Sequence, residues 1–299
     1  MDKFIKNYPK ISIVTPSYNQ GQYLEDTILS VLGQGYPNLE YLIYDAASTD
    51  NSAEIIKKYE NRLYYWVSEK DKGQADAINK GFAKSTGEIL MWLNSDDVLM
   101  PNVLHFIAKQ YVENGDGIYF GNCIHFQENP LGNLHANGSN VLLYSNSIAL
   151  ELVDTIIQPS SFWSRKVWLQ TGNLADNFHF GFDWEWFLRA KNKNISFYPI
   201  NKTISMYRIH DAHKSGTGGV KRQKELLKIY EIYSPKYGIL YELIRNESFN
   251  LSFMEGVLFY ILKLFYKEGF SKTHFLKFVN RKKYKLYSVE EMDSIKWML

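Results

Sequence analysis

The chain has 299 residues, 45% of them hydrophobic and 16% aromatic, which is enough to bury a large core. Its 34 basic and 32 acidic residues leave a formal net charge of +2, so bulk charge gives no argument for a polyanion, and no nucleic-acid partner is expected. A single cysteine, Cys123, excludes an intrachain disulfide and a cysteine-based zinc site. The longest apolar run, Val257 to Leu262, is shorter than the roughly 20 residues that span a bilayer, and the N-terminus has no signal-peptide pattern. We therefore expect a cytoplasmic protein, one that could also lie peripherally at the inner face of the membrane.

Strand-like and helix-like segments alternate through the first 115 residues. Continuous apolar or β-branched runs predict the strands, and apolar residues at helical spacing predict the helices. Strands are expected at 11–15, 39–44, 63–67 and 88–93, and helices at 21–32, 51–59, 74–83 and 101–112. This alternation predicts an α/β fold with a Rossmann-like, doubly wound and mostly parallel sheet, whose ligands bind beyond the carboxyl ends of the strands.

The alternation weakens after residue 115. A strand is expected at 118–124, a loop at 127–140, short helices at 167–172 and 183–190, and amphipathic helices from 220 onward. We therefore predict a domain at 1–219 followed by a C-terminal helical region at 220–299. Within the domain, 1–115 would bind a nucleotide and 116–219 an acceptor.

Polar clusters follow each of the first four strands, and the most distinctive is Asn94-Ser95-Asp96-Asp97. Two adjacent carboxylates after a buried strand repel each other, so they need a cation or a charged ligand nearby. Oxygen ligands suit Mg²⁺ or Mn²⁺, and the phosphates of a nucleotide would complete the coordination shell. The alternative is structural, with Asp96 or Asp97 capping the helix expected near Pro101.

Five segments resemble family 2 glycosyltransferases of the GT-A type. They are ISIVTPSYN at 11–19, SVLGQ at 30–34, DAASTD at 45–50, DKGQADAINKG at 71–81 and GEILMWLNSDD at 87–97. Weaker similarity extends to about residue 215. The resemblance implies a GT-A fold and an inverting glycosyltransferase that uses a nucleotide-diphospho-sugar, with a UDP-sugar as the first candidate. It also implies Mn²⁺ or Mg²⁺, a hexosyl or N-acetylhexosaminyl group, and a glycan or lipid-linked acceptor in bacterial surface polysaccharide synthesis.

The family pattern, carried over residue by residue, assigns the donor site. Nucleobase and ribose contacts fall on Thr15, Pro16, Tyr18 and Asp45, further donor contacts on Asp71, Asp76, Asn94 and Asp97, and the metal on Asp96 and His210. An aromatic or proline face can stack on a base, and a carboxylate can accept a hydrogen bond from a base or a ribose. Packing for Tyr18, a turn cap for Asp45 and a solvated loop for Asp71 are the alternatives.

Ala46 and Ala47 stand where the family usually has glycines after the aspartate. Glycine permits a positive φ and close approach of a ligand, and alanine mostly does not. Either the turn is compatible with a right-handed backbone here, or donor binding is altered.

An inverting transfer needs a carboxylate that deprotonates the acceptor hydroxyl. The segment from Phe182 to Arg189 resembles the family's base motif and assigns the base to Asp183, although Phe182 replaces the usual acidic residue before it. Glu185 is the second candidate, about 200° away on a helix, so only one of the two can face a pocket. The alternative for Asp183 is a helix cap. The similar segment that begins at Gln158 implies that this residue faces the acceptor.

The segment from Tyr207 to Ser215 resembles a family segment that closes over the diphosphate, where Arg208 or Lys214 could neutralise a phosphate. His213 fits a surface histidine, and Gly216 to Gly219 fits a mobile lid. The aromatic and basic residues of the C-terminal region favour packed helices, or peripheral contact with anionic lipids.

Two other functions remain open. A non-catalytic protein that binds a nucleotide-sugar or glycan on the same fold would explain Ala46, Ala47, Asn94 and Phe182. A sugar-phosphate nucleotidyltransferase would need a glycine-rich loop with a basic residue, which Ser17 to Gln22 lacks.

Overall fold

A computed structural model describes residues 8–129, 133–140, 149–211, 214, 218–246, 253–266 and 270–299. The chain divides into two compact units. The first comprises Met1–Ser147 and Ile156–Arg222, and the second comprises Ile148–Thr155 and Gln223–Leu299. The assignment of donor, acceptor and helical parts to 1–115, 116–219 and 220–299 stays a prediction.

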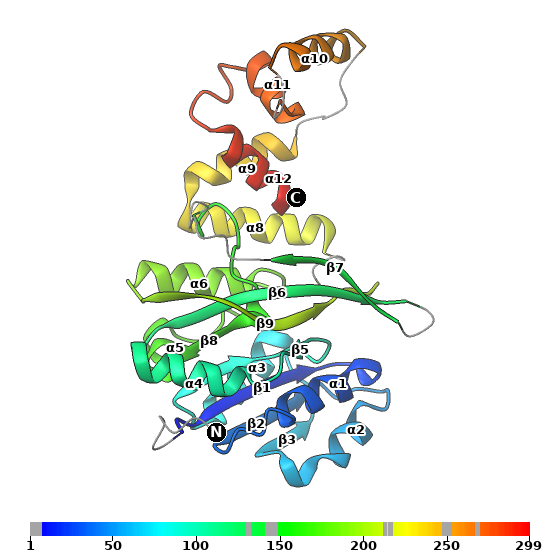
Figure 1. Ribbon diagram of the computed structural model, residues 1–299, viewed down its shortest axis with the longest axis vertical. Coiled ribbons are helices and arrows are strands. Elements are labelled where there is room, and N and C mark those ends of the chain that lie inside the picture. The colour runs from blue at the N-terminus through cyan, green and yellow to red at the C-terminus, as the bar shows by residue number, and fades with distance from the viewer. Residues whose placement is uncertain are drawn as a thin grey trace. The chain divides into compact units, whose positions relative to one another are not determined.

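Nine strands in the described part of the first unit form one sheet, in the order β3-β2-β1-β4-β8-β6-β9-β5, with β7 paired to β6. They are β1 (Ile11–Ser17), β2 (Leu39–Asp45), β3 (Tyr65–Ser68), β4 (Ile89–Trp92), β5 (Val98–Leu99), β6 (Ile118–Glu128), β7 (Leu134–Asn140), β8 (Ser161–Ser164) and β9 (Phe197–Arg208). The first four strands pair in parallel, which confirms the predicted doubly wound half. β8 runs antiparallel to both β4 and β6, and the long strands β6 and β9 lie side by side (Figure 1).

Six α-helices in the described part of the first unit connect these strands. They are α1 (Gly21–Leu32), α2 (Ser52–Lys58), α3 (Gln74–Lys84), α4 (Val103–Asn114), α5 (Arg165–Thr171) and α6 (Phe182–Asn192). The helix predicted to start at Pro101 begins at Val103, because Asn102 is left-handed with φ 60°. Asn102 is thus the cap position of α4, and the alternative that Asp96 or Asp97 caps this helix is wrong.

The loop predicted at 127–140 is also wrong. β6 continues to Glu128, and β7 returns along it in an antiparallel register that pairs Cys123 with Asn140 and Glu128 with Leu134. Main-chain pairing makes this strand, although its sequence, LHANGSN, is polar. The sequence also failed to predict β8 and β9.

Both faces of β1, β2 and β4 are buried, which explains their continuous apolar sequences. Ile11 and Ile13 of β1 belong to a core cluster that includes residues of α1, α2 and α4. Val14 points to α3, where a Cβ atom added to Gly81 would lie only 2.4 Å from Val14 Cγ1. The glycine therefore lets α3 pack directly on β1.

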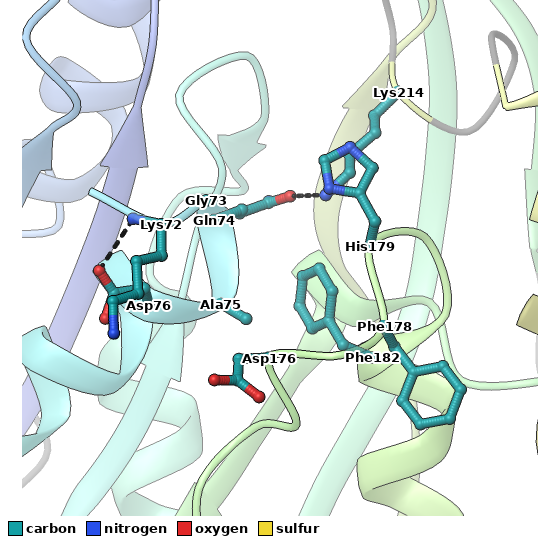
Figure 2. A pocket seen from close by; sticks show the side chains of 10 residues that line it. All are labelled: Lys72, Gly73, Gln74, Ala75, Asp76, Asp176, Phe178, His179, Phe182 and Lys214. Carbon is teal, nitrogen blue, oxygen red and sulfur yellow. Dashed lines mark hydrogen bonds between the residues drawn. The ribbon is translucent and has the colours of Figure 1, made fainter. Parts of the chain in front are cut away.

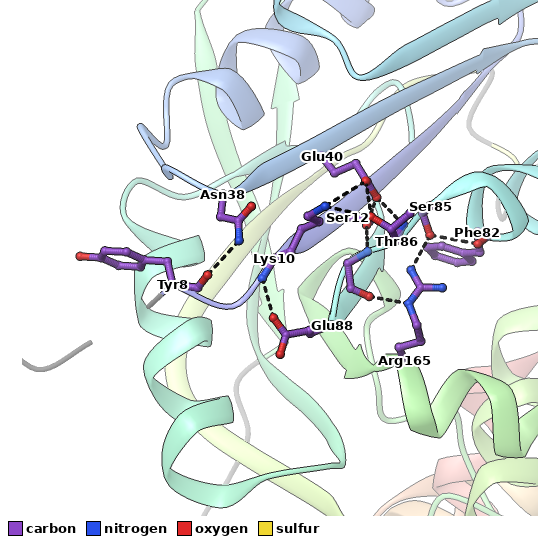
Figure 3. A network of polar contacts seen from close by, with 11 residues as sticks. Tyr8, Lys10, Ser12, Asn38, Glu40, Phe82, Ser85, Thr86, Glu88 and Arg165 are labelled. Atoms are coloured by element: carbon purple, nitrogen blue, oxygen red, sulfur yellow. Dashed lines mark hydrogen bonds and ion pairs between the residues drawn. The ribbon is translucent and has the colours of Figure 1, made fainter. Parts of the chain in front are cut away.

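A buried polar network fixes the amino ends of β1, β2 and β4 (Figure 3). Glu40, only 2% exposed, accepts hydrogen bonds from the Ser12 hydroxyl and from the backbone N–H and hydroxyl of Thr86. Arg165, at the start of α5, donates to the Gly87 carbonyl at 2.6 Å and to the Ser85 hydroxyl at 2.9 Å. Burial raises the pKa of Glu40, but the hydrogen bonds from Ser12 and Thr86 and the charge of Lys10 hold it below its ordinary value. The network thus ties α5 to the parallel sheet at the end opposite the polar strand termini.

The second unit is helical, as predicted for the C-terminal region. It contains most of α8 (Gly219–Tyr233), followed by α9 (Pro235–Arg245), α10 (Phe253–Tyr266), α11 (Lys272–Val279) and α12 (Val289–Met298). Glu291 of α12 accepts from Lys236 of α9 at 2.7 Å and from the Tyr237 hydroxyl at 3.0 Å. Within the described ranges, no helix has the length and hydrophobicity needed to cross a membrane.

Candidate active site

The chain turns sharply after β4 and buries Asp97. The N–H of Asp97 donates to the Asn94 carbonyl, and the carboxylate accepts from the backbone N–H of Arg208 and from the Asn94 amide, each at 3.2 Å. Burial and the neighbouring Asp96 charge raise the pKa of Asp97 well above its usual value, against these two hydrogen bonds. Because Asp97 is 0% exposed, it supports the turn from within and leaves the surface to Asp96.

Asp96 lies beside His210, the other residue predicted to bind a metal. The Asp96 Oδ2 and His210 Nε2 atoms are 3.0 Å apart, and the imidazole ring packs 4.7 Å from the ring of Tyr23. These side chains are 18% and 9% exposed. Residues 114 positions apart in sequence therefore present one carboxylate oxygen and one imidazole nitrogen together.

Arg208, at the end of β9, holds the Asp96 turn in place. Its Nε donates to the Asp96 carbonyl at 3.1 Å, and its guanidinium pairs with Asp26 at 2.8 Å and with Glu128 at 3.3 Å. The rings of Tyr23 and Phe126 each lie 4.6 Å from its central carbon. Arg208 is 3% exposed, so its charge is already matched within the protein, which does not favour the hypothesis that it neutralises a phosphate.

Asp45, at the end of β2, organises the next turn on the same edge of the sheet. Its carboxylate accepts from the backbone N–H and hydroxyl of Ser48 and from the hydroxyl of Ser68. Ala47 in this turn has a φ of 55°, so the alternative of a right-handed turn is wrong at this residue. An L-residue in this conformation is strained by roughly 1–2 kcal/mol, which Asp45 and the surrounding contacts must offset.

The residues predicted to contact the donor at the end of β1 differ in burial. Thr15 is fully buried with its hydroxyl 3.0 Å from that of Tyr41, and Pro16 is also buried. Tyr18, in contrast, is 61% exposed directly beyond the strand. Of these residues, Tyr18 offers the aromatic face that a nucleobase could stack on.

The first turn of α3 lines a small pocket with an empty volume of about 250 Å³. Figure 2 shows the Lys72–Asp76 segment on one side, the Asp176–Phe182 segment on the other, and Lys214 reaching Gln74 between them. Asp71 accepts from the N–H of Gly73 at 2.8 Å, and Asp76 forms a 3.0 Å ion pair with Lys80. Burial raises the pKa of Asp76, but Lys80 and the Lys72 N–H together lower it below its ordinary value.

Gln74 links the pocket to the turn after β4. Its amide nitrogen donates to Asn94 Oδ1 at 2.7 Å, and its amide oxygen accepts from Lys214 Nζ at 2.8 Å. The ammonium of Lys214 also lies 5.0 Å from the centre of the Phe182 ring. A continuous polar chain thus runs from Asn94 through Gln74 to Lys214, beside the first turn of α6.

Asp183 and Glu185, both in the first turn of α6, have different surroundings. Burial raises the pKa of Asp183, while its own backbone hydrogen bonds and the charges of Lys214 and Arg222 act in the opposite direction. Glu185 is 5% exposed and accepts two hydrogen bonds from Arg189, at 3.1 and 2.8 Å. Gly181 occupies the cap position of α6, so the alternative that Asp183 is the helix cap is wrong.

Gln158 is buried beside β4. Its amide nitrogen donates to the Trp92 carbonyl at 2.7 Å, and its amide oxygen has no hydrogen-bond partner among the described residues. Its side chain is 5% exposed. His213 and residues 216–217 of the predicted lid lie outside the described residues.

The structure brings four residues to the site that sequence reasoning did not single out as site residues: Gln74, Asp176, Phe178 and His179. Gln74 lies in the quoted segment 71–81, which was the available signal. The other three lie between the motifs, so only the folded backbone reveals that they face Lys72 and Gln74.

A parallel half-sheet carries carboxylates at its strand ends, and a mixed half continues it and brings His210, just after β9, beside Asp96. This arrangement defines a GT-A transferase fold. The family model of Glycosyl transferase family 2 matches residues 12–172, more than half of the chain, and the protein belongs to this family.

Three named relatives are similar to parts of the chain. Glycosyltransferase GlyG of Streptococcus pneumoniae is 34% identical over 128 residues, or 42% of each chain. The putative teichuronic acid biosynthesis glycosyltransferase TuaG of Bacillus subtilis is 40% identical over 92 residues, covering 30% of this chain and 36% of TuaG. The match therefore spans less than half the length of both relatives. The GalNAc(5)-diNAcBac-PP-undecaprenol beta-1,3-glucosyltransferase of Campylobacter jejuni is 29% identical over 209 residues, covering 67% of this chain and 65% of that one.

Solved structures share the fold over more of the chain. Residues 1–349 of Staphylococcus aureus TarS, in complex with UDP-GlcNAc, align with a TM-score of 0.59 at 14% identity, covering 96% of this chain and 90% of that one. The mannosyltransferase PcManGT from Pyrobaculum calidifontis, in complex with GDP-Man and Mn²⁺, aligns with a TM-score of 0.58 at 16% identity, covering 81% and 66%. At these identities the likeness shows the fold.

Proposed function

We propose that this protein is an inverting glycosyltransferase that moves a sugar from a nucleotide-diphosphate donor to a glycan or lipid-linked acceptor in bacterial surface polysaccharide synthesis. The observation that carries the proposal is the Asp96–His210 pair at the end of β4, beside a turn organised by Asp45 and near a carboxylate of raised pKa on α6. The names of TuaG and of the Campylobacter jejuni relative support surface polysaccharides and lipid-linked acceptors as the class.

The carboxylate oxygen of Asp96 and the imidazole nitrogen of His210 fit the coordination of a divalent cation such as Mn²⁺ or Mg²⁺. Two neighbouring ligands at about 2.1 Å from an octahedral ion are about 3.0 Å apart, which is the separation of Asp96 Oδ2 and His210 Nε2. No cluster of three such ligands occurs in the part of the chain that the structure describes, so donor phosphates and water would fill the other positions. When bound, the cation would stabilise the charge that develops on the departing nucleotide diphosphate.

Asp183 is the residue we propose as the general base. A carboxylate with a raised pKa accepts a proton from an acceptor hydroxyl more readily than an ordinary aspartate does. Glu185 is engaged by Arg189 through both of its oxygens, so its contacts favour a structural role. Tyr18, the Asp45 turn, Asp71 and Asn94 would contact the nucleoside and sugar of the donor, and Gln158 stays a proposed acceptor contact.

Release of nucleotide diphosphate from a panel of nucleotide sugars in the presence of Mn²⁺ tests the proposal. We expect Asp96→Ala to abolish release, and Asp183→Asn to lower kcat by about 10²–10⁴-fold while still binding donor. The matched control is Glu185→Gln, which should reduce stability more than turnover because it weakens the pairing with Arg189. Unchanged turnover in Asp183→Asn would refute the assignment of the base. Donor binding by the unmodified protein without any turnover would instead favour a non-catalytic binding protein.

A further inference from the structure

We propose that the second unit docks on the surface of an anionic lipid bilayer through helix α10 and the basic segment at 270–285. The inference concerns where the protein works and is independent of the transfer reaction, so either can fail without the other.

Helix α10 exposes an unusual amount of apolar surface. Its sequence is FMEGVLFYILKLFY, and five apolar side chains are 40% or more exposed: Met254, Val257, Leu258, Tyr260 and Ile261. A helix that is apolar over most of its circumference is normally covered, by a protein core or by lipid. The buried Phe259 instead anchors α10 to the unit, with its ring 6.0 Å from that of Phe270 and 5.8 Å from that of Phe275.

The length of α10 favours the membrane interface over a membrane span. Its 14 residues extend about 21 Å, whereas a bilayer core is about 30 Å thick. An amphipathic or apolar helix of this length can lie in the plane of the headgroups and bury its side chains in the acyl boundary.

The basic segment next to α10 gives the surface its charge. Residues 270–285 contain six basic side chains and no acidic one: Lys272, Lys277, Arg281, Lys282, Lys283 and Lys285. Five of them are exposed, whereas Lys277 donates to the Tyr287 carbonyl. Tyr284 is fully buried and its N–H donates to the Asn280 carbonyl, so the basic residues around it belong to an ordered turn.

Apolar side chains are interspersed with these charges. Phe278, Val279 and Leu286 are 58%, 41% and 76% exposed. Basic and apolar groups together match an anionic bilayer, which offers negative headgroups and a hydrocarbon layer. A second copy of the chain fits less well, because a symmetric contact would place the same positive segments against each other. A nucleic acid would match the charges but would not cover Met254 or Ile261.

Vesicle co-sedimentation of the full chain without donor tests the proposal. We expect binding to vesicles of phosphatidylcholine mixed with phosphatidylglycerol, and much weaker binding to phosphatidylcholine alone. The variant Arg281→Gln/Lys282→Gln/Lys283→Gln should bind the anionic vesicles on the order of 100-fold more weakly, because each basic residue near such a surface contributes roughly a factor of five. Raising the salt concentration should weaken the wild type in the same direction.

Two further variants separate the possible explanations. Tyr260→Ser/Ile261→Ser should lower the affinity by about tenfold or more, since it removes insertion and leaves the charge unchanged. The charge-matched control, Lys57→Gln/Lys58→Gln/Lys109→Gln on exposed helices of the first unit, should bind like the wild type. Failure of the wild type to bind anionic vesicles, or equal losses in both triple variants, would overturn the proposal. So would a dimer in sedimentation equilibrium that Tyr260→Ser/Ile261→Ser converts to monomer while vesicle binding is unchanged.

Discussion

In the turn after β2, glycine substitutions at two neighbouring alanines should have opposite effects on stability. Ala47 has a φ of 55°, a left-handed conformation that costs an L-residue roughly 1–2 kcal/mol, whereas Ala46 is not among the residues of positive φ in the described chain. Ala47→Gly removes this strain but adds freedom to the unfolded chain worth about 0.5–1 kcal/mol. The net expectation is a stabilisation of about 0.5–1 kcal/mol.

Ala46→Gly is the matched control, because it incurs the same entropy cost without relieving strain. It should destabilise the protein by about 0.5–1 kcal/mol. Urea unfolding followed by a signal of the first unit, such as tryptophan fluorescence, measures both variants, since every tryptophan except Trp297 lies in that unit. If both variants lose stability equally, the left-handed turn does not carry the strain inferred for it. Because Asp45 organises the same turn, donor affinity measured alongside shows whether glycine at Ala47 also changes the site.

Three further changes test the rest of the site and the fold. Lys214→Met removes a positive charge that lowers the pKa of Asp183, so this pKa should rise further. The acidic limb of the pH profile of kcat should then move to higher pH. A limb that does not move would argue against Asp183 as the base. Asp96→Asn should weaken Mn²⁺ binding in the presence of nucleotide diphosphate by at least tenfold, as measured by calorimetry, and equal affinity would exclude Asp96 as a ligand. Gly87→Ala should destabilise the first unit by about 2–3 kcal/mol in urea, because the added Cβ would lie 2.4 Å from Ser12 Oγ and 2.6 Å from its backbone nitrogen; a near-neutral result would mean that β1 and β4 can separate at little cost.

The parallel half of the sheet could be predicted from sequence because its signals are local. Residues 11–15 and 39–44 are apolar runs bounded by polar turns, and they appear as β1 and β2 with ends within two residues. β7 could not be predicted in this way. Its polar sequence becomes a strand through pairing with β6, a contact that only the folded chain provides.

The same distinction between local sequence signals and contacts of the folded chain applies to the site. The motif predicts that Asp96 follows a buried strand, and family resemblance adds His210. The 3.0 Å contact between them depends on the pairing of β9 with β5, the short strand directly after Asp97. The full burial of Asp97 and the positive φ of Ala47 are likewise tertiary properties. The resemblance predicts Asp97 as a donor contact, whereas in the structure its carboxylate accepts hydrogen bonds from the Arg208 N–H and the Asn94 amide.

The network around Glu40 has a practical consequence for engineering. It joins β1, β2, β4 and α5 at the end of the strands opposite Asp45 and Asp96, without sharing a hydrogen bond with either. Variant libraries that randomise exposed positions around Tyr18 or Asp71 can therefore be screened for new donor specificities without changing the hydrogen bonds that hold the opposite end of the sheet together. Conversely, a scaffold made more robust through Ser12, Thr86 or Arg165 would tolerate more of the destabilising substitutions that new specificities usually require.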